Sequence, residues 1–281
     1  MMMPGEASSD DCAQEVSPMA GLNQRMREVY FTNLARKKPD PEEEQRLVDL
    51  VFESAKRIVV HPSRPRYRKL TQWQAGGTGE FAIEETLDEN PTLLDWEQIY
   101  LENQEERQPV FHGLLDCSSS MSGEKHLLAS IAVAVMLLDS PPAGISLFTF
   151  ANESRLIRQL GHTESIRETL LRFLRHRPKG FTNIRAGLEA AWKEHQRLGG
   201  RRRCVGLLAS DGRSTEGGDP LEVAKYFDTL VVLHMQGPGS SIEASRELAA
   251  AGNGWCLEVK ELSELPHRLY DALRAVAQRG V

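Results

Sequence analysis

The chain has 281 residues, 40% hydrophobic and 26% charged, with a formal net charge of -6. That length can bury one substantial core and carry an extension, but it leaves little room for two full-size domains. The negative charge argues against a nucleic-acid partner, because no excess of Lys and Arg exists to release phosphate counterions. Residues 1–16 lack a basic segment followed by an apolar one, and the apolar runs are too short to cross a bilayer. The sequence therefore predicts a cytoplasmic protein with no membrane partner.

The four cysteines lie far apart and form no CxxC pair: Cys12, Cys117, Cys204 and Cys256. Neither a zinc knuckle nor a thioredoxin-like motif can be drawn from that spacing. The last three sit within apolar runs, where a free cysteine behaves as a small hydrophobic residue. A structural role in a reducing compartment is therefore expected for these three cysteines.

The first part of the chain gives a weak and interrupted pattern. Residues 1–22 are rich in Ser, Asp, Gly and Met without apolar periodicity, so a disordered leader is expected there. Apolar residues then recur at helical spacing up to residue 60, and Pro39 and Pro41 interrupt them, which predicts two helices. Connectors containing Gly and Pro and an acidic stretch follow. Residues 23–108 are thus expected to form a helical and irregular N-terminal extension.

From residue 109 onward, strand-like and helix-like segments alternate. Apolar runs predict six strands, at 110–115, 145–150, 155–160, 204–209, 229–234 and 255–259. Helical periodicity predicts six helices, at 124–138, 164–175, 184–198, 220–227, 241–250 and 262–278. This alternation predicts an α/β domain over residues 109–281, with a Rossmann-like, mostly parallel sheet and helices on both faces. The turn at Asn152 and Glu153 is too short for a crossover, so one antiparallel strand is expected at an edge.

Hard oxygen donors stand at three places where a strand stops or a helix starts. Asp116, Ser118 and Ser120 follow the first strand, Thr182 precedes a helix, and Asp211 ends a central strand. Ligands of open parallel sheets bind beyond the carboxyl ends of the strands, so these five side chains are expected to converge. The set suits a hard divalent ion such as Mg²⁺, and Mn²⁺ suits it equally. Because the hydroxyls bound directly to the ion are neutral, the ion would bind a carboxylate of a partner at its open coordination position.

Each piece of this pattern also has a purely structural explanation. The segment from Asp116 to Ser120 could cap the following helix, Thr182 could cap another, and the residues around Asp211 could form a turn. Their combination in this order on an α/β pattern favours the metal site. His112 and His234 lie inside two predicted strands and are expected to be hydrogen-bonded core or interface residues rather than metal ligands.

The segment Asp116-x-Ser-x-Ser120, the Phe-Thr-Asn-Ile segment at 181–184 and the Ser-Asp-Gly segment at 210–212 resemble one family signature. It is the metal-ion-dependent adhesion site (MIDAS) of von Willebrand factor A (VWA) domains, and the resemblance covers roughly residues 109–278. It implies Mg²⁺ or Mn²⁺ at the top of the sheet and a protein ligand that completes the coordination with an acidic side chain. The departures are small: Ser119, for example, stands where many members have glycine. They leave every metal ligand in place.

The extension has a weaker resemblance. A strand, the acidic stretch 84–88, a tryptophan-containing helix and the Arg107-x-Pro109 entry are similar to bacterial intracellular VWA proteins that work beside MoxR-type AAA+ ATPases. They are also similar to the D-type subunits of magnesium and cobalt chelatases. The resemblance implies an adaptor or substrate receptor rather than an enzyme. The chain has no GxxxxGK[ST] motif, so ATP hydrolysis would belong to a partner.

Two other functions remain open. The ion could tie three loops together while the extension builds a homo-oligomer, and Mg²⁺ would then stabilise the fold without affecting any partner. A Mg²⁺-dependent phosphohydrolase would also place an aspartate at the end of its first strand. That chemistry needs a second acidic residue two positions on, where this chain has Ser118. The sequence thus favours binding over catalysis.

Overall fold

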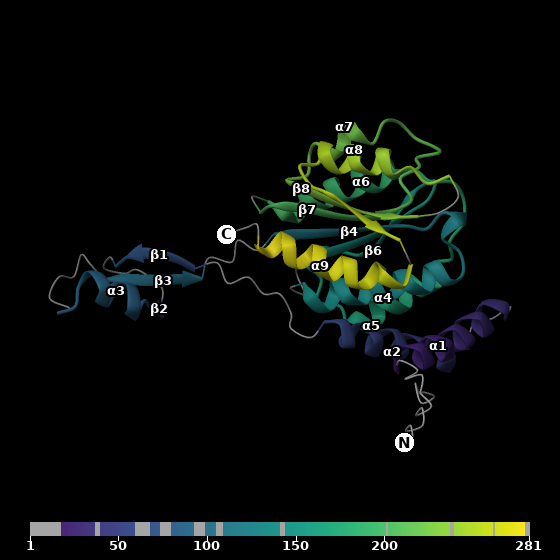
Figure 1. Ribbon diagram of the computed structural model, residues 1–281, viewed down its shortest axis with the longest axis horizontal. Coiled ribbons are helices and arrows are strands. Elements are labelled where there is room, and N and C mark those ends of the chain that lie inside the picture. Colours follow the sequence, from purple (N-terminus) through teal and green to yellow (C-terminus); the bar gives the residue numbers. More distant parts are fainter. Residues whose placement is uncertain are drawn as a thin grey trace, which may run out of the picture.

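A six-stranded sheet forms the centre of the molecule (Figure 1). The computed structural model describes residues 18–36, 40–59, 68–73, 80–92, 99–104, 109–140, 144–200, 202–236, 239–260 and 262–278. The strands of the sheet are β4 (Val110–Asp116), β5 (Ile145–Phe150), β6 (Ser154–Arg158), β7 (Cys204–Ser210), β8 (Thr229–Met235) and β9 (Cys256–Val259). Their order is β6-β5-β4-β7-β8-β9, and the pairs are parallel except for β5 and β6. The predicted α/β sheet with one antiparallel edge strand is confirmed.

Helices cover both faces of the sheet, as predicted (Figure 1). One face carries α4 (Glu124–Asp139), α5 (Ile166–Arg175) and α9 (Leu265–Gln278), which opens after a 3₁₀ turn at Leu262–Glu264. The other face carries α6 (Ile184–Glu194), α7 (Leu221–Ala224) and α8 (Ile242–Ala251). Two separate clusters of buried side chains, one on each face, hold these layers together. Because β4, β5, β7 and β8 are buried along their whole length, their sequences are continuous apolar runs.

Two of the predicted helices are shorter than their sequence pattern. Helix α6 ends at Glu194 and continues as a π-helical turn, His195–Gly199, in place of a regular helix to residue 198. Helix α7 has only four residues, although apolar residues recur at helical spacing from Pro220 to Phe227. Phe227 is buried in the core just before β8 starts, so the apolar spacing there reflects packing rather than a longer helix.

Two N-terminal helices, α1 (Pro18–Ala35) and α2 (Pro41–Ile58), lie outside α4 and α5 as a further layer (Figure 1). Their start signals are local: Asp40 caps α2 by accepting a hydrogen bond from the backbone N–H of Glu42, and Pro41 occupies the first turn. The two predicted helices are confirmed. Helix α1 begins inside the segment predicted as a leader, and residues 1–17 lie outside the described residues.

Helices α1 and α2 share the hydrophobic core of the sheet domain. Met26, Tyr30 and Val51 are buried in the same cluster as the side chains of α4 and α9. This layer explains why α4 is buried around nearly its whole circumference, since it packs between the sheet and α2. The domain boundary at residue 109 stays a prediction, but the packing ties this part of the extension to the sheet.

The segment between α2 and β4 contains a small antiparallel sheet, where the sequence predicted irregular structure. Its strands β1 (Arg68–Gln72), β3 (Tyr100–Gln104) and β2 (Glu80–Phe81) lie in that order, and helix α3 (Ile83–Glu89) accompanies them. These short strands are mostly polar and give no alternating apolar signal, so the sequence pattern does not indicate a sheet there. The tryptophan-containing helix was predicted from residues partly outside the described ones.

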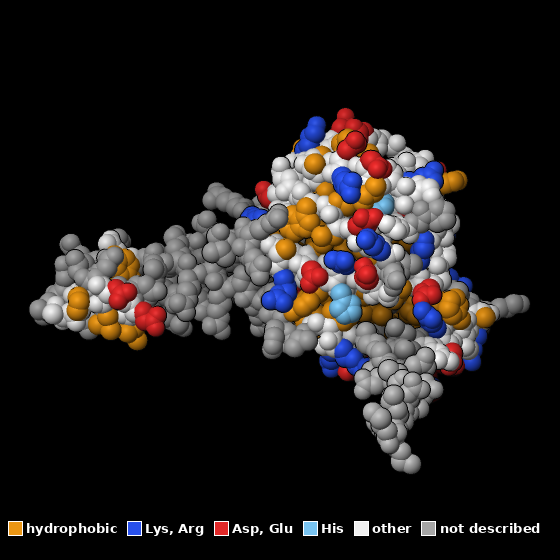
Figure 2. Space-filling view, in the orientation of Figure 1, with side chains coloured by type: hydrophobic (Ala, Val, Ile, Leu, Met, Phe, Trp, Pro, Cys, Tyr) orange, Lys and Arg blue, Asp and Glu red, His pale blue; other side chains and the backbone are white. Residues whose placement is uncertain are grey.

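Hydrophobic side chains are exposed on the small sheet and its helix (Figure 2). Phe81, Ile83 and Leu87 have exposed fractions of 45%, 57% and 41%. Figure 1 shows this unit beside the larger body rather than within its layers. Among the described helices, none combines the length and the hydropathy that crossing a bilayer requires.

Replacing Leu47 on α2 by alanine tests the shared core. Leu47 is 4% exposed within the cluster that joins α2 to the sheet domain, so Leu47→Ala is expected to lower the free energy of unfolding of the whole chain by about 2–5 kcal/mol. Urea unfolding monitored by circular dichroism measures this change. The matched control is Gln45→Ala on the exposed side of α2. If Leu47→Ala behaved like this control, α2 would not share the core.

Acid is expected to weaken the contact between α1 and α4. Burial, with a smaller contribution from the charge of His176, lowers the pKa of His126 to about 4 from 6.5. Nδ1 of His126 lies 3.1 Å from the Tyr30 hydroxyl, and its ring stacks on Phe173. Because the folded pKa is below the unfolded one, this stability is fully present above 6.5 and is lost as the pH falls towards about 4. His126→Gln should reduce the slope of the urea midpoint against pH in that window, and an unchanged slope would contradict this assignment.

Candidate metal site at the carboxyl edge of the sheet

The strand order of the sheet reverses at the carboxyl end of β4. From β4 the chain passes through α4 to β5 on one side, whereas β7 pairs with β4 on the other. The strand order thus changes direction beside β4, which is where open α/β sheets bind ligands. Asp116 is the last residue of β4, and Asp211 follows the last residue of β7. The two predicted aspartates therefore come from neighbouring parallel strands.

The loop after β4 is organised around the buried carboxylate of Asp116, which is 1% exposed. Its Oδ1 accepts a hydrogen bond from the backbone N–H of Ser118 at 2.8 Å, and its Oδ2 accepts one from the Ser210 hydroxyl at 3.2 Å. The hydroxyl oxygens of Ser118 and Ser120 lie 3.0 Å apart. A 3₁₀ turn, Ser119–Met121, follows. Three of the predicted donors are thus held on one short loop.

Backbone hydrogen bonds join this loop to the one that carries Thr182. The N–H of Ser119 donates to the carbonyl of Gly180 at 3.1 Å, and the N–H of Lys179 donates to the carbonyl of Cys117 at 2.9 Å. Gly180 has a φ of +86°, and a Cβ there would lie 1.9 Å from Oδ1 of Asn152. A side chain at position 180 would thus clash with the β5–β6 turn as well as strain the backbone.

Thr182 is fixed in turn by the loop that follows Asp211. Its N–H donates to the Thr215 hydroxyl at 2.9 Å, and its carbonyl accepts from the Thr215 N–H at 2.8 Å. The three loops with the five predicted donors are therefore hydrogen-bonded in series. Sequence reasoning missed Ser210 and Thr215, which support these loops. Ser210 directly precedes Asp211 at the strand end, and that adjacency was an available signal.

The charges at this edge favour a cation. Burial raises the pKa of Asp116, hydrogen bonds from Ser118 lower it, and the negative charge of Asp211 raises it further. Two carboxylates that repel each other across a crevice are stabilised when a divalent cation lies between them. Two carboxylates and three hydroxyls form a hard-oxygen donor set, which is what Mg²⁺ and Mn²⁺ prefer. The residues present therefore fit such an ion.

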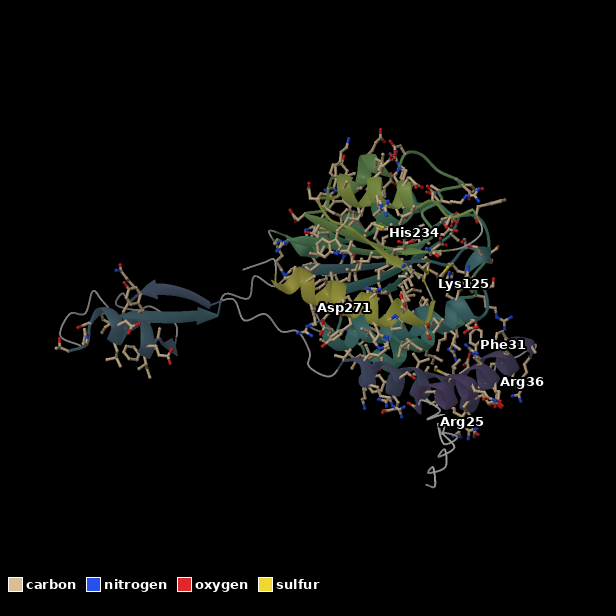
Figure 3. All side chains as sticks on the ribbon, in the orientation of Figure 1. Arg25, Phe31, Arg36, Lys125, His234 and Asp271 are labelled. Carbon is tan, nitrogen blue, oxygen red and sulfur yellow. The ribbon has the colours of Figure 1, made fainter. Side chains whose placement is uncertain are left out.

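The two strand histidines lie in the core, as predicted. His112 is fully buried, and its Nδ1 lies 2.7 Å from the Ser146 hydroxyl. His234 is 1% exposed, and its Nδ1 lies 2.8 Å from the Ser245 hydroxyl; Figure 3 shows it on β8. Burial lowers the pKa of both imidazoles, and the charge of His195 lowers that of His112 further. Both histidines are hydrogen-bonded residues of the interior.

Comparison with known proteins identifies the fold. No family model and no curated protein matches the chain. Among solved structures, a von Willebrand factor type A protein from Catenulispora acidiphila matches with a TM-score of 0.53 and 15% identity, covering 62% of this chain and 43% of that one. Proximal thread matrix protein 1 from the mussel byssus, with a zinc-occupied MIDAS motif, matches with a TM-score of 0.51 and 20% identity. That match covers 60% of this chain and 48% of the byssus protein.

The chain thus spans less than half the length of each of these two proteins. At such low identities, the likeness establishes the arrangement of strands and helices and leaves function to be argued from the residues. The sheet domain of this chain has the VWA fold.

An isosteric change at Asp116 tests for the metal. Asp116→Asn removes one of two mutually repelling carboxylates, so in EDTA the variant is expected to be at least as stable as the parent chain. Adding Mg²⁺ at about 100 times its Kd should stabilise the parent by about 2.7 kcal/mol and leave the variant unchanged. Thermal unfolding with and without Mg²⁺ measures both effects. Asp271→Asn, on the exposed side of α9, should respond like the parent, and an equal Mg²⁺ response in Asp116→Asn would place the ion elsewhere.

Proposed function

We propose that this chain is a metal-dependent protein-interaction module. Asp116, Ser118, Ser120, Thr182 and Asp211 would hold a Mg²⁺ or Mn²⁺ ion, and an Asp or Glu side chain of a partner protein would complete its coordination. The observation that carries this proposal is the hydrogen-bonded assembly of three loops around a buried carboxylate at the crevice of a VWA fold. The neutral hydroxyls leave the ion Lewis-acidic, which favours an anionic ligand from outside.

The environment of Asp116 supports binding rather than catalysis. Both of its carboxylate oxygens already accept hydrogen bonds, from Ser118 and Ser210, and the side chain is buried. A nucleophilic aspartate needs a lone pair directed at its substrate and a neighbouring group that protonates the leaving group. The residue two positions on, Ser118, is a hydroxyl donor without acid strength at neutral pH.

Two exposed aromatic side chains adjoin the loops of the site. Phe181 precedes Thr182 and is 61% exposed. Phe31 on α1 is 44% exposed, and its ring lies against Gly123 in the turn that follows Ser120. Figure 3 shows Phe31 and Lys125 at the same edge of the molecule. Apolar contacts of this kind would surround the metal-bound carboxylate and add affinity and specificity.

The partner that we propose is a cytoplasmic AAA+ ATPase of the MoxR type or a chelatase-like complex, for which this chain would be an adaptor or substrate receptor. The similarity of the extension to bacterial intracellular VWA proteins supports this choice. The cytoplasm is also the compartment in which the three described cysteines, all free thiols, stay reduced. The ATPase itself would supply the hydrolysis.

Affinity capture in Mg²⁺ followed by elution with EDTA tests the proposed function. A partner held through the ion should elute with EDTA and should be absent from a capture with Thr182→Ala, which deletes one proposed ligand. Thr163→Ala, an exposed threonine before α5, is the matched control and should capture the same partner. The captured protein is then purified and titrated calorimetrically. Binding that is indifferent to EDTA and to Thr182→Ala would refute the metal bridge.

The second candidate is a structural role for the ion, favoured by the way the three loops depend on one another for their hydrogen bonds. It predicts that Mg²⁺ raises the unfolding temperature while the affinity for every captured partner stays the same in EDTA. The calorimetric titration described above separates the two functions. Capture of an AAA+ protein would support the adaptor role specifically.

A further inference from the structure

A second cluster of metal-ligating side chains lies at the opposite, amino-terminal end of the same two strands. His112 is near the start of β4, Cys204 is the first residue of β7, and His195 follows the end of α6. One ligand atom from each of the three, an imidazole nitrogen or the thiol sulfur, lies within 4.8 Å of the others. The exposed fractions are 0% for His112, 4% for His195 and 1% for Cys204. The cluster is separate from the oxygen donors at the carboxyl edge.

Hydrogen bonds orient both imidazoles towards one point. Nε2 of His112 lies 3.1 Å from Nδ1 of His195, while Nδ1 of His112 is paired with the Ser146 hydroxyl at 2.7 Å. Nδ1 of His195 faces Nε2 of His112, and the tautomers of the two rings set which of these nitrogens carries the proton. Metal-binding histidines are oriented in this way, with the second nitrogen fixed by a hydrogen bond.

The serine hydroxyl allows His112 to present either a proton or a lone pair. When Ser146 donates to Nδ1, Nε2 of His112 carries the proton and donates to His195. When the hydroxyl rotates and accepts from Nδ1, Nε2 of His112 has a lone pair that can accept a proton from Nδ1 of His195, 3.1 Å away, or bind a metal ion. A change between these two states needs only a hydroxyl rotation and a tautomer shift.

The backbone is shaped around the ring of His195. This residue opens the π-helical turn His195–Gly199, a rare local structure that is found frequently at functional sites. A Cβ on Gly199 would lie 2.3 Å from Nδ1 of His195. Only glycine lets the chain pass so close to the nitrogen that faces the cluster.

Aromatic rings enclose the cluster. The ring of Trp192 stacks on His195 at 5.6 Å, and Tyr226 stacks on Trp192 at 5.3 Å. Phe227 contacts His112 edge to face. Tyr226 is 54% exposed, so the outer wall of the enclosure borders on solvent. An apolar surrounding of this kind limits the access of solvent to a bound metal.

We propose that His112, His195 and Cys204 form a second metal site, for a thiophilic ion, Zn²⁺ or Cu⁺. Two imidazole nitrogens and one thiolate are donors that these ions prefer over Mg²⁺ or Ca²⁺. Cu⁺ accepts three ligands of this kind, and Zn²⁺ would add a water as its fourth ligand. The proposal does not depend on the metal at the carboxyl edge, which uses oxygen donors only.

Binding of a metal ion at this site releases one proton, that of the Cys204 thiol. Cys204 is a buried free thiol, so a metal that binds its sulfur must displace the thiol proton. Forming the metal–sulfur bond releases that proton to solvent and leaves a thiolate. Oδ2 of Asp228 accepts a hydrogen bond from the N–H of Cys204 at 2.7 Å, which places a further negative charge beside the ion.

Cobalt substitution tests the proposal without any assay of activity. The metal-free full-length chain is titrated with Co²⁺ in excess Mg²⁺, which occupies the carboxyl edge. A thiolate-to-cobalt absorption band is expected in the near ultraviolet, saturating at one ion per chain. Added Zn²⁺ should displace the cobalt and remove the band. An anaerobic titration of Cu⁺ against a chelator gives the affinity for Cu⁺, which can be compared with that for Zn²⁺. Absence of the band in folded protein would overturn the proposal.

Variants locate the ligands. Cys204→Ser should abolish the band, and His195→Gln should weaken cobalt binding by at least about 10–100-fold, the loss seen even for outer-shell partners. Cys256→Ser, a half-buried cysteine on β9, and Asp116→Ala should keep the band. Persistence of the band in Cys204→Ser would refute the assignment.

If the variants unfold, X-ray absorption of the zinc-loaded parent chain decides the question. Sulfur and imidazole scattering around the zinc is expected. A shell of oxygen atoms alone would contradict the site.

Discussion

A carboxylate that is almost fully buried at a strand end must be hydrogen-bonded or neutralised, and the carboxyl edge of this protein is arranged around that requirement. Asp116 receives a backbone N–H from its own loop and a hydroxyl from β7, so its position depends on the pairing of β4 with β7. The same loop then holds the neighbouring loops through Gly180 and Lys179. The charge of Asp211 adds a repulsion that a cation would relieve. The geometry of the edge thus follows from one buried charge and the strand pair beside it.

The sequence predicts the helices and strands well where burial gives apolar residues a regular spacing. The central strands are mostly apolar and most of the helices have clear apolar spacing, so the order of strands and helices in the sheet domain, and the placing of oxygen donors at strand ends, follow from pattern and topology. The small sheet could not be predicted because β1 and β3 are short and polar, and pair only with each other and β2. The supporting roles of Ser210 and Thr215 depend on which hydroxyls meet which loops, a three-dimensional fact. The same holds for His112, His195 and Cys204, which share no sequence motif.

The layer formed by α1 and α2 changes the surface that a partner would meet. Phe31 lies against the turn after Ser120, and Arg27 forms an ion pair with Glu124 at the start of α4. A protein bound at the carboxyl edge would therefore touch α1 as well as the loops. Exposed ion pairs contribute little stability in isolation, so the shared hydrophobic core, rather than charge, fixes this helix in place.

The parallel pairing of β4 and β7 also limits communication across the domain. Asp116 lies four positions after His112 along β4, a span of about 13 Å at the rise of a parallel strand. Both neighbours of β4 are hydrogen-bonded to it in register along that span. The strands of such a ladder can shift only by whole residues. A shift of one residue would move every core side chain to the wrong face. The two ends of β4 thus lie farther apart than the roughly 7–10 Å beyond which the effects of separate changes on stability usually add.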